Sequence, residues 1–236
     1  MAGISNSEFL NKVIPLGFDV ATLGGYSLDT PTIEASRKIV ERGRKEFDFP
    51  LNEIFSNIEN EVASIKQVNK DVKVSANVRA TTPQPIIEVG NIKELDIVEI
   101  NCHCRQDEIT SIGCGQEMLK RPDLEEFISQ IVDNVDCEVS VKIRANIEGI
   151  DTLEVAKLIE SSGVDYLHID AMKKGVFDAD YDLVKEICDA VDIKVIGNNS
   201  LNCIENIEKM IDTGVYGFSI ARAVISNNLN FDISHF

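Results

Sequence analysis

Residues 138–170, EVSVKIRANIEGIDTLEVAKLIESSGVDYLHID, give the clearest indication of the fold. It opens with an apolar run rich in Val and Ile (Glu138–Ile143), continues through a segment of helical period (Thr152–Ser162), and closes on a second short apolar run (Tyr166–Asp170). Asp151 stands where a helix N-cap residue is expected. A strand–helix–strand unit of this length predicts two parallel strands joined by a helical crossover.

The same alternation continues in both directions along the chain. Five more short apolar runs predict strands: Asp19–Leu23, Val72–Val78, Ile97–Asn101, Ile193–Gly197 and Gly217–Ile220. Helical segments are predicted before or between them: Glu8–Leu16, two helices within Ser27–Asn69, Pro122–Val135, Tyr181–Ala190 and Cys203–Thr213. Strict alternation of strands and helices indicates a parallel sheet covered by helices.

Seven strands are thus recognised, and Met1-Ala2-Gly3 is interpreted as the remnant of a shortened first strand. The count then becomes eight, and the sequence predicts an α/β fold, a (β/α)8 TIM barrel, in one domain over residues 1–236. A doubly wound open sheet is the alternative architecture. Its usual nucleotide-binding signal, a glycine-rich turn after the first strand, is absent.

Composition narrows the function classes. A formal net charge of −17 argues against general affinity for nucleic acid, because phosphate contacts need clustered Lys and Arg. No apolar run approaches the roughly 20 residues that span a bilayer, so we expect no membrane partner and a cytoplasmic location. Among the six cysteines, Cys102, Cys104 and Cys114 lack a fourth ligand at zinc-site spacing, and no metal is predicted.

Polar residues recur toward the ends of successive strands, at the alternate positions whose side chains face the barrel axis. They are Ser75, Asn77, Arg79, Glu99, Asn101, Ser140, Lys142, Arg144, His168 and Asp170. Active sites of such barrels lie where strands end, so these residues predict a ligand site. A structural ion-pair network inside the barrel is the alternative. His168 fits either interpretation, as a polar core residue or as a site residue.

The segment from Glu99 to Leu119 resembles the dihydrouridine synthase family of flavoenzymes. That family has Asn-x-Gly-Cys-Pro after a barrel strand, followed by a glycine-rich stretch. Here Asn101-Cys102-His103-Cys104-Arg105 continues without a gap to Gly113-Cys114-Gly115. Val139–Arg144 is similar to the family's Val-Thr-Val-Lys-Ile-Arg, Val195–Asn199 to Val-Ile-Gly-Asn-Gly, and Met1–Ile4 to Met-Ala-Gly-Val. The matches keep their order along nearly the whole chain.

The resemblance implies an FMN-dependent oxidoreductase that reduces the C5=C6 bond of uridine in tRNA, with NAD(P)H as reductant. Cys104 matches the general acid: a neutral thiol gives a proton to one carbon while the flavin gives hydride to its neighbour. Asn101 matches the asparagine beside the substrate base. Lys142 matches the lysine near flavin N1 and O2, where a cation stabilises the anionic reduced ring. These three residues are the predicted catalytic set.

The resemblance also implies two binding sets. The FMN-binding positions are Met1, Ala2, Gly3, Asn77, Lys142, Asp170, Gly197, Asn198, Asn199, Ala221 and Arg222. The substrate-binding positions are Asn101, His103, Arg105, Arg144 and His168. Gly197, Asn198 and Asn199 match the phosphate loop, where backbone N–H groups together with Arg222 would hold the phosphate.

Several positions depart from the family pattern. His103-Cys104-Arg105 replaces Gly-Cys-Pro, Ala221-Arg222-Ala223 replaces Gly-Arg-Gly, and Asp170 replaces a histidine, with Lys173 or Lys174 expected to compensate its charge. The chain resembles a short form without the family's C-terminal helical tRNA-binding domain. Two other functions therefore stay open beside tRNA reduction: a flavin-dependent reductase of a small, pyrimidine-like or other unsaturated metabolite, and a non-catalytic barrel that binds a flavin or phosphate ligand.

Overall fold

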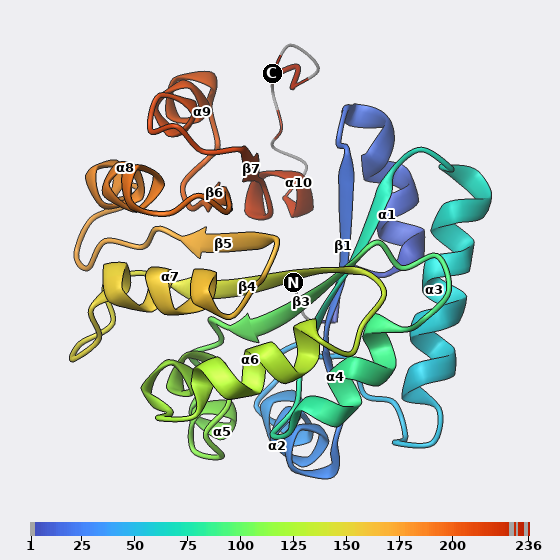
Figure 1. The fold of residues 1–236 in the computed structure, drawn as a ribbon. Helices are drawn as coiled ribbons and strands as arrows, with labels where there is room; N and C mark the ends of the chain where they lie inside the picture. The colour runs from blue at the N-terminus through green and yellow to red at the C-terminus, as the bar shows by residue number, and fades with distance from the viewer. Residues whose placement is uncertain (1–2, 227–228, 230, 234–235) are drawn as a thin grey trace.

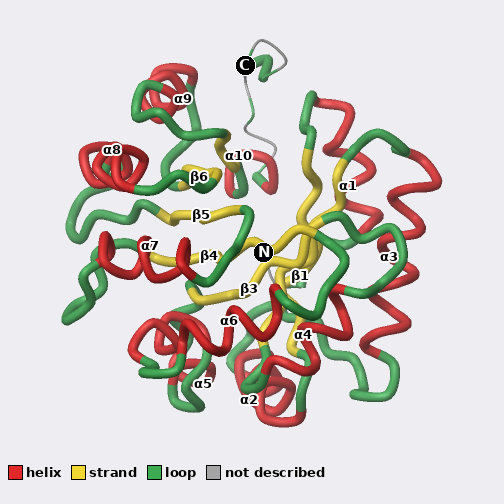
Figure 2. Tube along the Cα trace, viewed as in Figure 1, coloured by secondary structure: helices red, strands yellow, loops and turns green. Residues whose placement is uncertain are grey.

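The computed structural model describes residues 3–226, 229, 231–233 and 236. Seven parallel strands form one curled sheet in the order β1 to β7, and the helices lie around its outside (Figures 1 and 2). The strands are β1 (Val20–Ser27), β2 (Lys73–Arg79), β3 (Ile97–Cys102), β4 (Glu138–Arg144), β5 (Tyr166–Asp170), β6 (Lys194–Asn198) and β7 (Gly217–Ser219). This curled α/β arrangement confirms the predicted TIM-barrel class.

The helices follow the predicted alternation. They are α1 (Ser7–Val13), η1 (Ile14–Leu16), α2 (Thr30–Glu41), α3 (Ile54–Val68), α4 (Pro83–Gly90), α5 (Asp107–Thr110), η2 (Gly115–Lys120), α6 (Leu124–Val132), α7 (Thr152–Ser161), α8 (Tyr181–Ala190), α9 (Ile204–Ile211) and α10 (Arg222–Ile225). Asp151 caps α7 as predicted, because its side chain accepts hydrogen bonds from the backbone N–H groups of Leu153 and Glu154. Among the described residues, no helix is long and apolar enough to cross a membrane.

The sheet differs from the prediction in its first strand. Met1 and Ala2, two of the three residues interpreted as a strand remnant, lie outside the described residues. Gly3 lies in a turn, and Ser5 makes a single antiparallel bridge with Gly24 on β1. Within the described part of the chain the sheet therefore has seven strands, and β1 and β7 do not pair.

Strand β1 runs four residues beyond its predicted end at Leu23, through Gly24-Gly25 to Ser27. The register against β2 shifts between Gly24 and Tyr26. A Cβ atom on Gly25 would lie 2.7 Å from the Asn77 side-chain oxygen. Glycine is needed here because the backbone passes directly against a polar side chain in the barrel interior.

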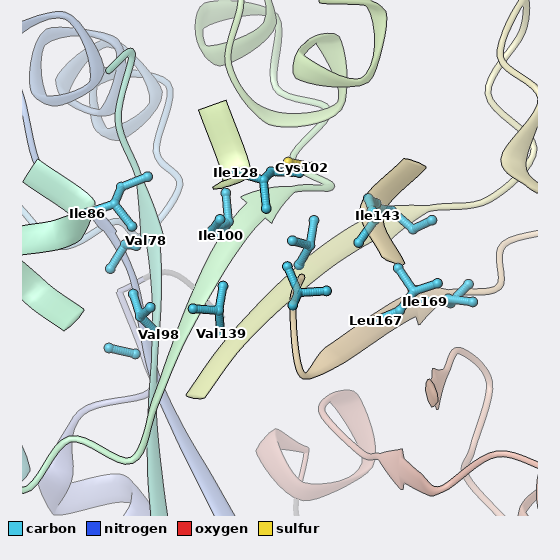
Figure 3. Close-up of a cluster of buried hydrophobic side chains, with 14 of the residues drawn as sticks. Val78, Ile86, Val98, Ile100, Cys102, Ile128, Val139, Ile143, Leu167 and Ile169 are labelled. Carbon is cyan, nitrogen blue, oxygen red and sulfur yellow. The ribbon is translucent and has the colours of Figure 1, made fainter. Parts of the chain in front are cut away.

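The apolar core lies between the sheet and the helices. Figure 3 shows outward-facing strand side chains, including Val98, Ile100 and Cys102 of β3, packed with Ile128 of α6. All four side chains are buried. Since strand side chains alternate between faces, Glu99 and Asn101 on the same strand face the barrel axis.

The amino-terminal end of the barrel is occupied by a charged cluster around Glu138. Its carboxylate bonds the Lys73 ammonium, accepts from the Tyr166 hydroxyl at 3.1 Å, and lies 3.4 Å from Lys194 Nζ. The Lys194 ammonium also lies 4.7 Å from the centroid of the Tyr166 ring. These residues begin their strands, so the cluster stabilises the end opposite the predicted site.

Candidate active site at the carboxyl end of the barrel

Glu99 is the centre of a hydrogen-bonded network inside the barrel. Its Oε1 accepts from Asn77 Nδ2 at 2.7 Å, and its Oε2 lies 2.6 Å from His168 Nδ1 and 3.4 Å from Ser140 Oγ. The other ring nitrogen of His168 lies 2.7 Å from Ser219 Oγ. The network thus ties together β2, β3, β4, β5 and β7, and it places His168 among buried polar groups.

The charges of this network follow from its surroundings. Burial raises the pKa of Glu99, but His168, Lys142 and Asn77 outweigh that effect and hold the pKa well below its ordinary value. Burial and the charge of Lys142 lower the pKa of His168, although Glu99 opposes them. An ionised Glu99 therefore accepts the Nδ1–H of a neutral His168, and Nε2 accepts the Ser219 hydroxyl.

The loop that carries Cys104 is held by Asn101. The side-chain oxygen of Asn101 accepts from the backbone N–H groups of His103 at 3.2 Å and Cys104 at 3.0 Å. Its Nδ2 donates to Asn77 Oδ1 at 2.7 Å, so the glutamate network extends into this loop. The Cys104 carbonyl in turn accepts from Gln116 N–H at 2.9 Å. Asn101 therefore organises the segment predicted to carry the chemistry.

Gly115 lets the chain pass close behind Cys104. Its φ is +61°, and a Cβ atom there would lie 2.3 Å from the Cys104 carbonyl oxygen. Gly113 also has a positive φ of +76°, but a Cβ atom on it would have no neighbour within 4 Å. Only Gly115 is therefore required by a close approach to the Cys104 loop.

The three cysteines of the motif lie in different environments. Cys102 and Cys114 are buried, and burial raises the pKa of each thiol to about 12. Cys104 is only partly buried. No group of three or more His, Cys, Asp or Glu residues in the described ranges is placed to hold a metal ion. Cys104 is therefore the cysteine of this motif that a ligand at the barrel mouth can reach.

Asp170, at the end of β5, is the centre of a second polar cluster, which includes His103 of the Cys104 loop. One carboxylate oxygen lies 3.0 Å from Arg144 Nη2 and 3.4 Å from His103 Nε2, and the other accepts from Asn199 Nδ2 at 2.6 Å. Arg144 Nε also donates to the His103 carbonyl at 3.3 Å. The structure thus brings four predicted site residues into one cluster: Arg144 and Asp170 from two strand ends, and His103 and Asn199 from two βα loops.

The charge of Asp170 is compensated differently from the prediction. Lys173 points elsewhere, with its Nζ 3.4 Å from an oxygen of Asp180, and Lys174 is exposed. Arg144 supplies the neutralising cation instead. The sequence did not indicate this choice, because Arg144 lies on the neighbouring strand and is opposite Asp170 only in the sheet register.

The loop after β6 adopts the backbone that a glycine would favour. Asn199 has a φ of +110° at the position where the family resemblance has glycine, and Ser200 has a φ of +55°. Asn198 Nδ2 donates to both the carbonyl and the hydroxyl of Ser219, at 2.7 and 2.8 Å. Gly197 is packed against α9, since a Cβ atom there would lie 2.2 Å from Met210 Sδ.

Lys142 is half-buried on β4, beside Asn101 of β3 and His168 of β5 in the sheet register. Among the described residues its ammonium makes neither a hydrogen bond nor an ion pair. An ammonium rarely lies inside a barrel without a partner. Its position at the strand ends therefore indicates a site for an anionic or electron-rich ligand.

The remaining predicted positions are not joined to these clusters. Arg105 and Arg222 are exposed, and neither side chain bonds another described residue. Ala221 is half-buried before α10. Gly3 packs against the backbone of residues 45–46. Met1 and Ala2, predicted to bind FMN, lie outside the described residues. The ligand roles of all these positions stay predictions.

Several residues of the site were missing from the predicted binding sets, among them Glu99, Ser219 and Arg79. Glu99 is the hub of the network, and its signal was visible as a carboxylate within an otherwise apolar strand. Ser219 carries no such signal, because a serine in a short final strand is unremarkable in sequence. Arg79 pairs with Glu46, which comes from a long connecting segment without periodicity.

The two site histidines predict a pH dependence of stability. Burial, with the charges of Lys142 and Arg144, lowers the pKa of His103 well below its ordinary value, and the pKa of His168 is also lowered. Below about pH 6.5 the unfolded chain binds protons that the native protein does not, so the free energy of unfolding falls by up to about 1.4 kcal/mol per pH unit for each histidine. This stability is fully present above that range.

Thermal unfolding followed by circular dichroism between pH 7.5 and 5.5 measures the effect. The melting temperature is expected to fall steadily below about pH 6.5, with a shallower fall for His103→Gln. A melting temperature that stays constant across this range would contradict the assignment of neutral histidines.

The fold and the site together define a class: a parallel α/β barrel of the TIM type with a polar, partly charged site at the carboxyl ends of its strands. The family model described as "Dihydrouridine synthase (Dus)" matches residues 50–235. The chain belongs to the dihydrouridine synthase family.

Individual relatives agree with this assignment. The chain is 36% identical to the uncharacterized protein MJ0144 of Methanocaldococcus jannaschii, over 98% of this chain and 89% of that protein. It is 30% identical to tRNA-dihydrouridine synthase B of Vibrio vulnificus, over 53% of this chain and 41% of the relative. A mouse tRNA-dihydrouridine(20a/20b) synthase [NAD(P)+]-like protein is 26% identical over 57% of this chain and 44% of its own length. The alignments with the two named synthases thus span less than half of those proteins.

Solved structures support the fold alone. A putative lyase/mutase from Burkholderia cenocepacia superposes with a TM-score of 0.63 at 14% identity, covering 95% of this chain and 77% of that one. An N-acetylmannosamine-6-phosphate 2-epimerase from Clostridium perfringens gives a TM-score of 0.52 at 15% identity, covering 87% and 85%.

Proposed function

We propose that this protein is an FMN-dependent oxidoreductase that reduces the C5=C6 bond of uridine in tRNA, with Cys104 as proton donor and NAD(P)H as the source of electrons. The observation that carries the proposal is that a partly exposed Cys104, fixed by Asn101, lies at the same barrel mouth as Lys142, whose ammonium makes no hydrogen bond or ion pair among the described residues. Membership of the dihydrouridine synthase family supports it.

The residues at the mouth fit a flavin mononucleotide. Lys142 makes no hydrogen bond or ion pair with the described residues, so its cation is available to the pyrimidine part of the ring, which is negatively charged when reduced. The positive-φ backbone at Asn199 and Ser200, together with the exposed cation of Arg222, offers donors and charge for a phosphate. When bound, FMN would supply hydride to one carbon of the substrate double bond.

The chain's own residues supply the proton and the positioning. Asn101 orients the Cys104 loop and lies beside Lys142 in the sheet register. The Cys104 thiol gives its proton to the carbon adjacent to the one that receives hydride, and water returns a proton to the sulfur afterwards. His103 and Arg144, joined through Asp170, would contact the substrate base.

A second candidate function is the reduction of a small unsaturated metabolite at the same site. The net charge of −17 favours it, because an acidic protein gains little from phosphate contacts. Tight binding of tRNA that weakens steeply with added salt would count against this candidate.

Deleting the gene and measuring dihydrouridine in cellular tRNA by nucleoside mass spectrometry tests the proposed function. We expect the loss of dihydrouridine from at least one tRNA position, restored by the intact gene but not by a copy encoding Cys104→Ala. Unchanged dihydrouridine in a strain without a second synthase would refute tRNA as the substrate.

The close approach at Gly115 gives a paired prediction. Gly115→Ala and Gly113→Ala both place a side chain on backbone of positive φ, so both should lower the melting temperature. Only Gly115→Ala also pushes on the Cys104 carbonyl, and a displacement of about 1 Å costs on the order of 10²-fold in rate. We therefore expect turnover to fall much further for Gly115→Ala than for Gly113→Ala. Equal losses of turnover in the two variants would contradict this prediction and show that the Cys104 loop accommodates a side chain at position 115.

A further inference from the structure

Arg79 is a buried cation next to the site that neither the flavin nor the substrate prediction uses. It ends β2, and its side chain is 2% exposed. Its Nη2 lies 2.6 Å from Glu46 Oε2, and it donates to the Gly25 carbonyl at 3.1 Å and to Ser36 Oγ at 3.3 Å. Burying an ion pair of this kind is costly, and a hydrophobic pair of similar size would serve folding as well.

The other end of the guanidinium faces the predicted proton donor. Arg79 Nη1 lies 3.9 Å from Cys104 Sγ, within hydrogen-bonding range of a sulfur atom. The thiol sulfur is the only hydrogen-bond partner of Nη1 among the described residues. The buried charge is therefore directed at one atom, the atom that changes charge when a proton leaves it.

We propose that Arg79 positions the Cys104 sulfur and stabilises the negative charge that develops on it during proton donation. The inference rests on the proposed function. As the S–H bond breaks, the proton forms the new C–H bond on the substrate, and the S–H electron pair stays on sulfur as a thiolate. A fixed guanidinium stabilises that thiolate more than the neutral thiol. Water then restores the proton.

Glu46 holds the guanidinium in this orientation. Its side chain is 4% exposed, and the backbone of residues 45–46 is packed under Gly3, where a Cβ atom would lie 2.6 Å from Glu46 N. Arg79 is thus fixed from β1, α2 and the segment after α2. A cation held on three sides needs no rearrangement when charge appears on the sulfur.

The alkylation rate of Cys104 by iodoacetamide, followed by mass spectrometry between pH 6 and 10, tests the inference without any substrate. The main variant is Arg79→Met with Glu46→Met, which removes both charges and leaves neither one buried alone. We expect alkylation at pH 7 to slow by about tenfold and the pH of half-maximal rate to rise by about one unit. Arg79→Lys, which keeps a positive charge, should retain part of the native alkylation rate at pH 7.

Lys66→Met is the matched control, because it breaks the half-buried Lys66–Asp96 ion pair away from Cys104. It should change the melting temperature and leave the alkylation profile unchanged. If Cys104 of the Arg79→Met/Glu46→Met variant is alkylated at the native rate, the inference is overturned, and Arg79 and Glu46 serve folding alone.

Turnover separates this inference from the proposed function. The double variant should lower kcat for uridine reduction by about tenfold with little change in KM, since Arg79 acts on the sulfur and not on the bound base. A native protein that forms no dihydrouridine would refute the proposed function, whereas the alkylation profile would still decide whether Arg79 acts on Cys104. An unchanged kcat beside a shifted alkylation profile would overturn the catalytic part of the inference.

Discussion

Cys104→Ala is expected to lower the rate of dihydrouridine formation by about 10²- to 10⁴-fold, the usual contribution of a general acid. The substitution removes the proton donor and leaves the loop intact, because Asn101 and Gln116 hold Cys104 through its backbone. FMN binding should be unaffected, since the predicted flavin contacts lie on other strands. The measurement is the initial rate with unmodified tRNA, beside the flavin content of the purified variant.

Cys102→Ala is the matched control for this prediction. The Cys102 side chain is fully buried on the outer face of β3, with its sulfur 4.0 Å from Met118 Sδ. Its removal should cost about 1 kcal/mol of stability and leave the rate within about twofold. If Cys102→Ala were inactive and Cys104→Ala active, the family register through Gly115 would be misassigned.

Lys142→Met is expected to weaken FMN binding and slow flavin reduction by about tenfold each or more. Met preserves the length and the apolar stem of the side chain but removes the charge next to the ring. Lys142 makes no ion pair among the described residues, so the variant breaks no salt bridge, and Glu99 keeps its contacts with His168 and Asn77. Fluorescence titration measures the dissociation constant, and anaerobic stopped-flow absorbance with NAD(P)H measures the reduction rate.

Lys194→Met places the same substitution on a barrel strand at the opposite end. Lys194 bonds Glu138 at 3.4 Å and lies over the Tyr166 ring, so its loss should lower stability alone. Equal FMN affinity in Lys142→Met and the native protein would contradict the assignment of Lys142 to the flavin ring.

Most of the fold was predictable because its signals are local. Each strand is a short run of Val and Ile, and each predicted crossover helix has an apolar period with a recognisable start, such as Asp151 before α7. The exception at the end of β1 has a non-local cause. The predicted strand stopped at Leu23, whereas β1 continues through Gly24-Gly25, and the approach of Asn77 that requires glycine is a contact between strands.

The site was predictable only where residues carry their own signal. Side-chain parity placed Asn77, Glu99, Asn101 and His168 in the barrel interior, and all four are buried there. The hydrogen-bond and ion-pair partners of the site residues depend on the sheet register and on loops without periodicity. Arg144 neutralises Asp170 across two strands, and Glu46 meets Arg79 from a connecting segment. Such pairings arise from tertiary structure, which no pattern along the chain encodes.

The most direct test of the proposed function is a single anaerobic turnover. The protein is loaded with FMN, reduced, freed of excess reductant and mixed with unmodified tRNA, while flavin absorbance and dihydrouridine are measured together. We expect the oxidised flavin spectrum to return and one dihydrouridine to form for each flavin reoxidised. A protein that takes up no FMN, or a reduced flavin that stays reduced with tRNA, would contradict the proposed function.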